Sequence, residues 1–560
     1  MDKRSREEIA EEMSRFEKAI ENNHDASQRE IIEQLGVPRS TLRHWLDRKE
    51  SIDAAPEVID FFESPGGTAF LHRLVLGAHY VFTLCSPCGI RPVCLYLELT
   101  GLDRFVASSY GSQQKVSVSM EEESVEFGRK ETGRLAAEMP HKKISIAEDE
   151  TFHPETCLVA VEPVSNYILL EKYASGRKSV DWTSAFKEAT ESLNIETIQC
   201  TSDEGRGIVS HVTNDLKAHH SPDLFHVQQE IIKGTSIVLE SRKKKADKVL
   251  AQDSEEVSLH EKAKETFFTG KRPVGRAPNF DKRIKKARDQ EEKARKALET
   301  AEKHRESVKQ AVKGISNSYH PFDLETGAPR SPEQVSSLIE NHFAIIEQAA
   351  SEASLPERCN KKIQKAKRVL VKMTASVAFF FLMIWAKIEA LSLAPEVEQA
   401  VINQLIPGIY LDIVSKKAKT KEQRDILRKR SEDILLPLQS RHGPFKGLSQ
   451  DEIVTIENVA VECAQLFQRS SSCVEGRNGH LSLYHHSLHR LSNRKLEALT
   501  VVHNFFIKRS DKTTAAERFF GSKPKDMFEW LLERIDLPGR PAQKRSHPES
   551  KSYLLQQNAS

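Results

Sequence analysis

The stretch KISIAEDETF at residues 143–152 begins the part of the chain that decides its fold. Ile144 and Ile146 alternate with polar residues before three acidic ones, which is the pattern of a β-strand with one buried face. Two further segments, CLVAVEP at 157–163 and NYILLEKY at 166–173, are apolar and β-branched and meet at a tight turn. The sequence therefore predicts three antiparallel strands at this point.

The segments that follow alternate between helix and strand. In chain order they are DWTSAFKEATESLN (181–194, helix), IETIQCTSD (195–203, strand), GRGIVSHVTNDLKAH (205–219, helix) and PDLFHVQQEIIKG (222–234, a short strand running into a helix). Three antiparallel strands followed by this alternation resemble the order of a ribonuclease H fold. That order predicts that the first and fourth strands lie side by side, so that acids at their ends come together.

Three acidic residues are placed where such a fold would use them. Asp149 lies near the end of the first strand, Asp203 at the end of the fourth, and Glu475 in the helical segment SSSCVEGRNGHLSLYHHSLHRL at 470–491. A pair of Mg²⁺ ions, for which Mn²⁺ can substitute, takes hard oxygen ligands of this kind and supports phosphodiester cleavage. We therefore predict these three residues as catalytic and metal-binding. The long interval between Asp203 and Glu475 must be an insertion that leaves and returns near the same point.

Neighbouring residues offer alternatives to this assignment. Glu148 and Glu150 flank Asp149, so a shift of one position is possible, and Asp181 competes for the first acid although capping of a helix explains it. Acids at strand ends and on helix surfaces are also often simply solvated. Four residues near the predicted acids are candidates for phosphate contacts: His226, Gln228, Arg477 and Asn478. For His226 a structural role is the alternative.

The first fifty residues predict a helix-turn-helix. Capping boxes at Ser5 with Glu8 and at Ser27 with Glu30 begin the first two helices. Gly36 then provides a turn before a third helix with a buried apolar face. That helix directs Arg39, Ser40, Arg43 and His44 outward, where they would meet the DNA major groove and phosphates. A small helical bundle with a glycine turn is the alternative.

Composition limits the remaining possibilities. A chain of 560 residues is too long for one hydrophobic core and predicts three or four units. Its 83 basic and 81 acidic residues nearly cancel, so any affinity for nucleic acid must come from local patches. The eight scattered cysteines suit a reducing compartment. Cys85, Cys88 and Cys94 have spacings that zinc could use, but no second ligand pair follows, and buried thiols are the favoured interpretation.

Residues 236–455 are predicted to be almost entirely helical. Within them, 257–313 is rich in Lys, Glu, Arg and Ala, which is typical of a long solvated hairpin or coiled coil. The interval 271–296 holds eleven basic residues and four acidic ones, so Lys271, Arg272 and Arg276 are predicted to contact DNA phosphates. An ordinary solvated face is the alternative. The 14-residue apolar run at 373–386 is too short to span a bilayer and predicts a buried core helix.

The predicted protein is multidomain α+β. Its parts are a helix-turn-helix domain at 1–52, a mostly helical linking domain at 53–141 with a possible second DNA-binding role, a first part of the catalytic core at 142–235, an all-α insertion with a basic coiled-coil hairpin at 236–455, a second core part with the glutamate helix at 456–537, and a disordered tail at 538–560.

Several segments together resemble the DDE transposases of bacterial insertion sequences, which have a ribonuclease H-like core interrupted by a helical insertion. The resemblance rests on 147–173, 201–208, 221–227, 319–327, 469–491 and 503–521. It implies that Asp149, Asp203 and Glu475 form the metal-binding triad.

The resemblance also implies an activity: nicking at transposon ends, followed by attack of the freed 3′-hydroxyl on target DNA. The expected setting is double-stranded DNA, a homo-oligomer of at least two chains, no membrane, and the nucleoid-associated cytoplasm of a bacterium. A ribonuclease H-like nuclease or junction resolvase is one alternative. A non-catalytic DNA-binding scaffold from a domesticated element is another.

Overall fold

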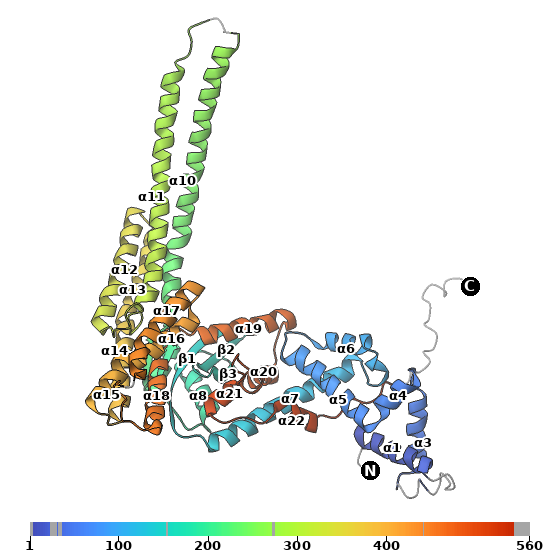
Figure 1. Ribbon diagram of the computed structural model, residues 1–560. Coiled ribbons are helices and arrows are strands. Elements are labelled where there is room, and N and C mark those ends of the chain that lie inside the picture. The colour runs from blue at the N-terminus through green and yellow to red at the C-terminus, as the bar shows by residue number, and fades with distance from the viewer. Residues whose placement is uncertain are drawn as a thin grey trace.

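The computed structural model describes residues 4–22, 31, 36–152, 155–271, 275–440 and 442–542. The chain is mostly helical, with a five-stranded sheet in the middle of its body (Figure 1). A pair of very long helices projects from one side of the body as an arm, and the N-terminal helices lie at the other side. The predicted α+β class is confirmed at this level.

The sheet has the strand order β3-β2-β1-β4-β5. β1 is antiparallel to β2 and parallel to β4, and β5 continues parallel to β4. The prediction that the first and fourth strands lie side by side is therefore confirmed. The strands are β1 Lys142–Phe152, β2 Thr156–Glu162, β3 Tyr167–Ala174, β4 Ile195–Ser202 and β5 His219–Pro222.

The connections between the strands follow the prediction with one correction. α8 (Ser179–Thr190) joins β3 to β4, and a short helix, α9 (Arg206–Ser210), joins β4 to β5. The fifth strand ends at Pro222, whereas the sequence predicts that it begins there. The reason is local: the Asp223 side chain accepts a hydrogen bond from the Phe225 N–H at 2.7 Å, which caps a helix and ends the strand.

Helices from both ends of the chain cover the sheet. Buried residues of these helices form one apolar cluster with the strands, and Tyr167 of β3 stacks on Phe519 with ring centroids 4.5 Å apart. The core that covers the sheet is therefore completed only when residues 472–534 return to it. The covering helices are α7 (Tyr110–Ala137), α19 (Ser472–Leu488), α20 (Asn493–Phe505), α21 (Ala515–Phe520) and α22 (Met527–Arg534).

The insertion is all helical, as predicted, and has its own hydrophobic core. Its first two helices form the arm: α10 (Leu224–Thr269) and α11 (Phe280–Ser318). The rest folds at the base of the arm as α12 (Pro332–Glu352), α13 (Glu357–Arg368), α14 (Leu370–Glu389), α15 (Pro395–Ala400), α16 (Ile406–Lys417), α17 (Lys421–Leu435) and α18 (Gln450–Gln465).

The structure moves both boundaries of the insertion. α10 is continuous from Leu224, and Leu224, Val227 and Ile231 already belong to the insertion core, so the predicted boundary at 235 falls inside one helix. At the other end, Ile456 and Cys463 of α18 pack in the same core, so the predicted boundary at 455 also comes too early. The insertion therefore runs from Leu224 to the segment just before α19.

The apolar helix α14 packs in the insertion core along one face, where Met373, Val377, Phe380 and Ile384 are buried. The segment Glu357–Glu389, which contains α13 and α14, is long and apolar enough to cross a membrane by length and composition alone. Within its apolar 18-residue window, however, 44% is buried inside the protein. The predicted core role of α14 is confirmed for this face. Its other side leaves Val371, Leu382 and Trp385 exposed.

The N-terminal helices form two small cores. Met13 and Phe16 of α1 (Arg6–Asn22) pack with Ile31 and with Leu42 and Trp45 of α3 (Arg39–Glu50), and the capping box at Ser5 and Glu8 is present. The capping box at Ser27 and Glu30 lies outside the described residues. The 53–141 segment is helical, as predicted, through α4 (Pro56–Glu63), α5 (Pro65–His79), α6 (Ile90–Leu99) and α7.

The segment after α22 crosses both N-terminal cores. Leu537 is buried in the second N-terminal core, which is formed mainly by residues of α5 and α6. Gly539 accepts a hydrogen bond from the Ala107 N–H at 2.8 Å, and Arg48 of α3 donates to the Pro541 carbonyl at 2.9 Å. These contacts hold the first residues of the predicted tail, 538–542, against the N-terminal helices. The rest of the tail, from residue 543, lies outside the described residues.

Candidate metal centre

Strand register places three aspartates in one row. In the parallel pair β1–β4, Ala147 lies opposite Thr201, and two residues further along each strand are Asp149 and Asp203. In the pair β4–β5, Ser202 lies opposite Pro222, so the next residues are Asp203 and Asp223. A hydrogen bond from the Asp223 N–H to the Ser202 carbonyl at 2.9 Å continues this pairing. Asp149, Asp203 and Asp223 therefore occupy corresponding positions on neighbouring strands, as predicted for the first two.

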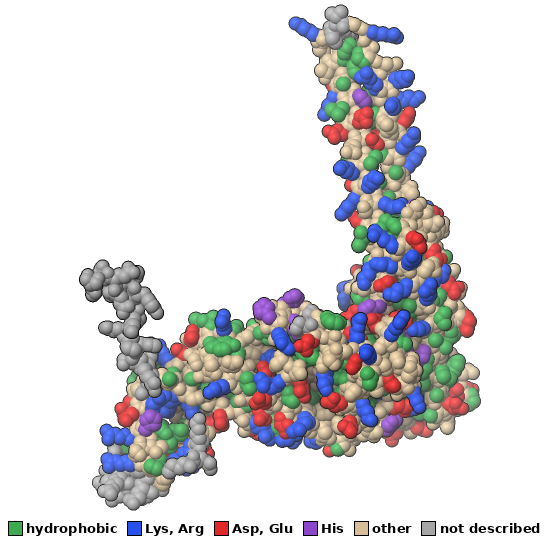
Figure 2. Space-filling model, turned by 180° about the vertical axis from the view of Figure 1, so that it is seen from behind, with side chains coloured by type: hydrophobic (Ala, Val, Ile, Leu, Met, Phe, Trp, Pro, Cys, Tyr) green, Lys and Arg blue, Asp and Glu red, His purple; other side chains and the backbone are tan. Residues whose placement is uncertain are grey.

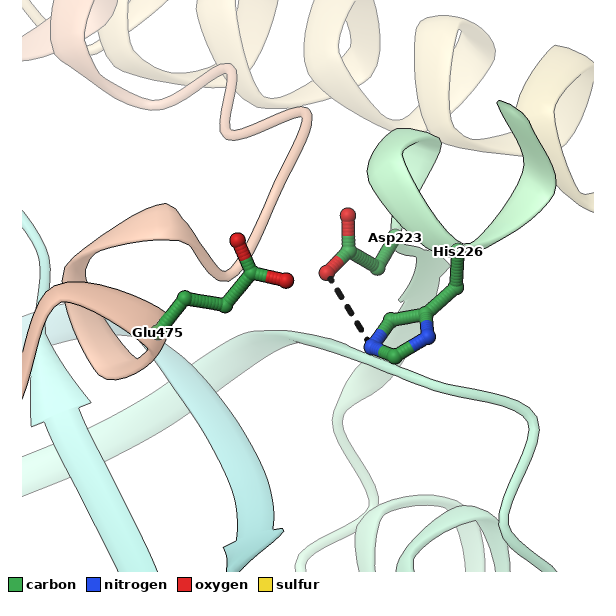
Figure 3. Close-up of side chains that lie close together, drawn as sticks. All are labelled: Asp223, His226 and Glu475. Carbon is green, nitrogen blue, oxygen red and sulfur yellow. Dashed lines mark ion pairs between the residues drawn. The ribbon is translucent and has the colours of Figure 1, made fainter. Parts of the chain in front are cut away.

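Glu475 reaches the same place from a helix. α19 packs on β1 and β2 through buried Val474, Leu481 and Tyr484, and Glu475 lies in its first turn. Carboxylate oxygens of Glu475 and Asp223 and a ring nitrogen of His226 lie within 4.8 Å of one another (Figure 3). The insertion thus leaves and returns beside the acids, as the spacing predicted.

Asp223 also fastens the two ends of the insertion to each other. Its carboxylate accepts hydrogen bonds from the Ser471 N–H at 3.2 Å and from the Ser471 hydroxyl, one turn before Glu475. The Leu224 N–H donates to the Arg469 carbonyl at 2.9 Å, and the Arg469 guanidinium donates to the carbonyl of Ser316 in α11 at 2.8 Å. This junction of Asp223, Leu224, Arg469 and Ser471 fixes the start of the glutamate helix relative to the arm.

Burial and like charge raise the pKa of two acids in the cluster. The pKa of Asp149 rises from 3.8 to about 6, because burial disfavours its charged form and the carboxylates of Asp203 and Asp223 add repulsion. The Glu475 pKa is raised by burial first and then by Asp223, while His226 opposes both shifts. A bound cation would relieve this repulsion, so the electrostatics fit a cation site.

Of the two predicted phosphate-contact residues on α19, Asn478 contacts one of the predicted metal-binding acids. Its amide NH₂ donates to Asp149 Oδ2 at 3.2 Å, and the Glu150 N–H donates to Asp149 Oδ1 at 2.8 Å. The Asn478 side chain therefore orients the Asp149 carboxylate from one turn beyond Glu475. Its own carbonyl oxygen is buried without a hydrogen-bond partner.

The neighbouring acids have other partners. Glu148 is fully buried beside His211, with Nε2 of the ring 3.5 Å from its carboxylate. Glu150 accepts from the Trp182 indole at 3.2 Å. Because side chains alternate along a strand, both point away from the face that carries Asp149. Asp181 accepts from the Lys178 N–H at 2.9 Å, which confirms its helix-capping role.

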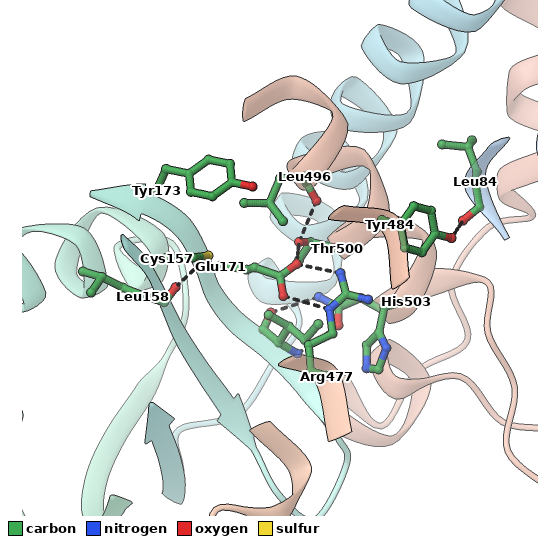
Figure 4. Close-up of polar contacts among 12 residues, drawn as sticks. Leu84, Cys157, Leu158, Glu171, Tyr173, Arg477, Tyr484, Leu496, Thr500 and His503 are labelled. Carbon is green, nitrogen blue, oxygen red and sulfur yellow. Dashed lines mark hydrogen bonds and ion pairs between the residues drawn. The ribbon is translucent and has the colours of Figure 1, made fainter. Parts of the chain in front are cut away.

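Two predicted phosphate contacts lie elsewhere. Arg477 is buried, and its guanidinium binds both carboxylate oxygens of Glu171 at 2.8 and 2.6 Å, with Thr500 donating to the same carboxylate (Figure 4). It sits two residues after Glu475 and so faces away from the acids. Gln228 donates to the carbonyl of Val312 in α11 at 2.9 Å. Both side chains are used to hold helices together, so we do not include them in the site.

Asp223 is not among the residues predicted for the site from the sequence. Its local signal is that of a helix cap after a proline, which gives an aspartate an ordinary role. A stronger signal was available in the spacing, since Asp223 directly follows the fifth strand as Asp203 follows the fourth. His226 was selected as a phosphate contact and lies within the acid cluster, 3.9 Å from Asp223 Oδ2.

The residues predicted to bind DNA are at the surface where the structure describes them. Arg39, Ser40, Arg43 and His44 are exposed on α3, and Lys271 and Arg276 are exposed at the end of the arm. Arg272 lies outside the described residues. Cys85, Cys88 and Cys94 are half-buried free thiols, and burial raises the Cys85 pKa to about 11. In the part of the chain that the structure describes, these cysteines join no metal-ligand group.

Among the described residues, Asp223, His226 and Glu475 form a group of potential metal ligands, and Asp149 and Asp203 lie in the neighbouring row of strand residues but outside that group. Such a set could hold divalent cations that accept oxygen ligands, with Mn²⁺ tolerating the histidine better than Mg²⁺. The profile of DUF6399, a family of unknown function, matches residues 401–547, which include Glu475 but neither Asp149 nor Asp203. No curated protein matches the chain.

Proposed function

We propose that the chain is a ribonuclease H-like DDE transposase that cleaves DNA at transposon ends and transfers the freed 3′-hydroxyl to target DNA. The observation that carries the proposal is the row of Asp149, Asp203 and Asp223 at neighbouring parallel strands. Asp223, the last of this row, lies within 4.8 Å of Glu475, which comes from a helix 272 residues after Asp203. The strand order 32145 with an insertion after the fifth strand supports the same fold assignment.

Asp149, Asp203 and Glu475 would hold two divalent cations, Mg²⁺ or Mn²⁺, which supply an activated nucleophile and charge stabilisation at phosphorus when bound. The residues of the chain perform the remaining work. Asn478 orients Asp149, and Asp223 fixes the start of the glutamate helix through Ser471. The electronegative cluster itself repels a DNA phosphate, so catalysis at this site requires the cations.

The exposed cations of α3 support double-stranded DNA as the substrate. Arg39, Arg43 and His44 lie on the outward face of a helix whose other face is buried by Leu42 and Trp45. This is the arrangement by which a recognition helix enters a major groove. We accordingly propose DNA-bound homo-oligomers in the bacterial nucleoid, since two transposon ends must be joined to one target.

A nuclease or junction resolvase of the same fold is the second candidate, because the acid cluster alone would also support simple hydrolysis. The two candidates differ in the fate of the 3′-hydroxyl. With a labelled DNA end, a transposase joins the label to a plasmid target, whereas a nuclease releases it without joining.

The proposal is tested with Asp203→Asn and a matched control, Asp181→Asn. The substrate is a plasmid carrying the DNA that flanks the coding region, incubated with Mg²⁺ or Mn²⁺. We expect Asp203→Asn to abolish nicking and joining while DNA binding in EDTA is unchanged. Asp181→Asn should keep activity, because that residue only caps α8. Nicking by Asp203→Asn at the wild-type rate would rule out the assigned site.

A further inference from the structure

The far end of the arm carries a group of unpaired cations. Lys282, Arg283, Lys285 and Lys286 are exposed on the first two turns of α11. Within the described residues none of these four has an ion pair, whereas nearby cations do: Lys264 is 2.7 Å from Asp281. Figure 2 shows Lys and Arg side chains on both sides of the end of the arm. We call the four residues the tip cations.

The arm holds the tip cations in a fixed direction. Phe280, Ala287 and Ala294 are buried in the seam with α10 and recur every seven residues, which is the spacing of a coiled coil. Phe267 and Phe280 close the end of the hairpin with ring centroids 5.3 Å apart. The tip cations lie between the seam positions and therefore point away from α10 into solvent.

Ion pairs across the hairpin occur along the whole arm. Near the base Arg305 lies 2.7 Å from Glu240, and near the tip Arg288 lies 2.6 Å from Glu261. The tip cations differ from these because, within the described residues, all four lie in one short exposed run and none of them forms an ion pair. They are therefore available to neutralise an external polyanion.

The length of α10 sets where that polyanion would lie. Asp223 of the metal centre directly precedes α10, and Lys264, which contacts the first turn of α11, is 41 residues further along it. At about 1.5 Å per residue this is about 60 Å. B-form DNA covers that distance in about 15–20 base pairs.

We propose that the tip cations bind phosphates of duplex DNA about 15–20 base pairs from the position held at the metal centre. The inference rests on the proposed function for the identity of the polyanion and for the duplex at the metal centre. It adds to that function a contact far from the metal centre, which would form only on DNA above a minimum length.

The test uses the full chain with Lys282→Gln, Arg283→Gln, Lys285→Gln and Lys286→Gln combined, since glutamine preserves helix propensity. A charge-keeping control carries Lys282→Arg, Lys285→Arg and Lys286→Arg. Binding to mixed-sequence duplexes of 10 and 60 base pairs is measured in EDTA between 50 and 200 mM salt, because the shorter duplex cannot span the distance from the metal centre to the tip. Circular dichroism confirms that each variant keeps the helical content of the wild type.

For the wild type and the arginine control, the salt slope of log affinity should be steeper by about 3–4 on the long duplex than on the short one. The glutamine variant should show equal slopes, so raising the salt should cost it about a hundredfold less affinity on the long duplex. Equal slopes for wild type and glutamine variant on the long duplex would overturn the proposal. A changed oligomeric state without a changed slope would overturn it in favour of contact between arms.

These measurements exclude divalent cations, so they do not depend on catalysis. If the tip cations alter the salt slope but neither the wild type nor any variant nicks DNA, the remote contact stands and the proposed activity fails. If nicking depends on Asp203 but the slopes are equal, the activity stands and the remote contact fails.

Discussion

The metal centre and the tip of the arm are two groups of charged residues built by opposite means. At the metal centre, aspartates of neighbouring strands are brought close to a glutamate from a helix much later in the chain, and burial together with like charge raises the pKa of Asp149 and Glu475. At the tip, four cations lie within five consecutive residues of one exposed helix. The comparison teaches that the positions of the charged groups near the sheet depend on the whole fold, whereas the spacing of the tip cations depends only on the helix that carries them.

The largest effect should come from breaking the buried ion pair that holds the glutamate helix. Arg477→Ala leaves the buried Glu171 carboxylate without its bidentate partner and should lower the free energy of unfolding by about 3–5 kcal/mol. Replacing both residues by apolar ones, Glu171→Leu with Arg477→Met, should cost far less because no buried charge is left unpaired. Denaturant unfolding measures both. An equal loss for the single and double changes would show that packing, not charge pairing, holds α19.

A smaller effect is expected at the junction that joins the arm to Glu475. Ser471→Ala removes a hydroxyl that donates to Asp223 and should reduce the rate of DNA nicking by about ten- to a hundredfold, as loss of an outer-shell partner of a metal ligand does. Ser471→Thr keeps the hydroxyl and should recover much of the rate. Affinity for DNA should stay constant in both variants. An unchanged nicking rate in Ser471→Ala would separate the junction from the catalytic site.

The pH dependence should differ between the two regions. Because the Asp149 pKa is raised to about 6 in the folded protein, its contribution to stability is present below about pH 4 and is lost as the pH rises through 6. The cation-free protein should therefore lose about 3 kcal/mol of stability over this window. Asp149→Asn should remove this step in a thermal melting series.

Cation binding should have the opposite trend, since the ligand must be deprotonated. Stabilisation by Mn²⁺ should grow as the pH rises from 5 to 7 in the wild type and should be small throughout in Asp149→Asn. A pH-independent Mn²⁺ effect in the wild type would contradict the placement of Asp149 in the site. The tip cations should contribute nothing to either trend.

The smallest effect should come from an ion pair of the arm. Lys264 and Asp281 are both substantially exposed, so solvent screens their attraction. Lys264→Gln should change the free energy of unfolding by less than about 1 kcal/mol. A loss as large as that of Arg477→Ala would mean that the arm is stabilised by charge pairing rather than by its apolar seam.

Much of the fold could be predicted from local patterns. Alternation of apolar residues identified the strands around Asp149 and Asp203, and composition identified the arm, because each pattern reflects a structure formed by residues close in sequence. The boundaries of the insertion were misplaced, since a helix that continues from Asp223 has no local mark where one core ends and the next begins.

The candidate site was predicted only in part for the same reason. Asp149, Asp203 and Glu475 were selected from their settings, and the row of aspartates places the first two together. Asp223 was not predicted because its role as a helix cap already explains it locally. Arg477 was predicted to contact phosphate because the sequence does not distinguish an exposed arginine near the metal centre from one buried in an ion pair. Its partner Glu171 lies 306 residues away.

By itself, the sequence determined most of the strands and helices, where the predicted acids lie along them, and that the arm carries excess positive charge, because these depend on alternation, spacing and composition within a few turns. The tertiary structure decided that Asp223 and His226 lie beside Glu475, that Arg477 forms an ion pair with Glu171, and that the tip cations lie far from the acids. Those outcomes depend on strand register and on where a long insertion returns, and neither is encoded by neighbouring residues alone.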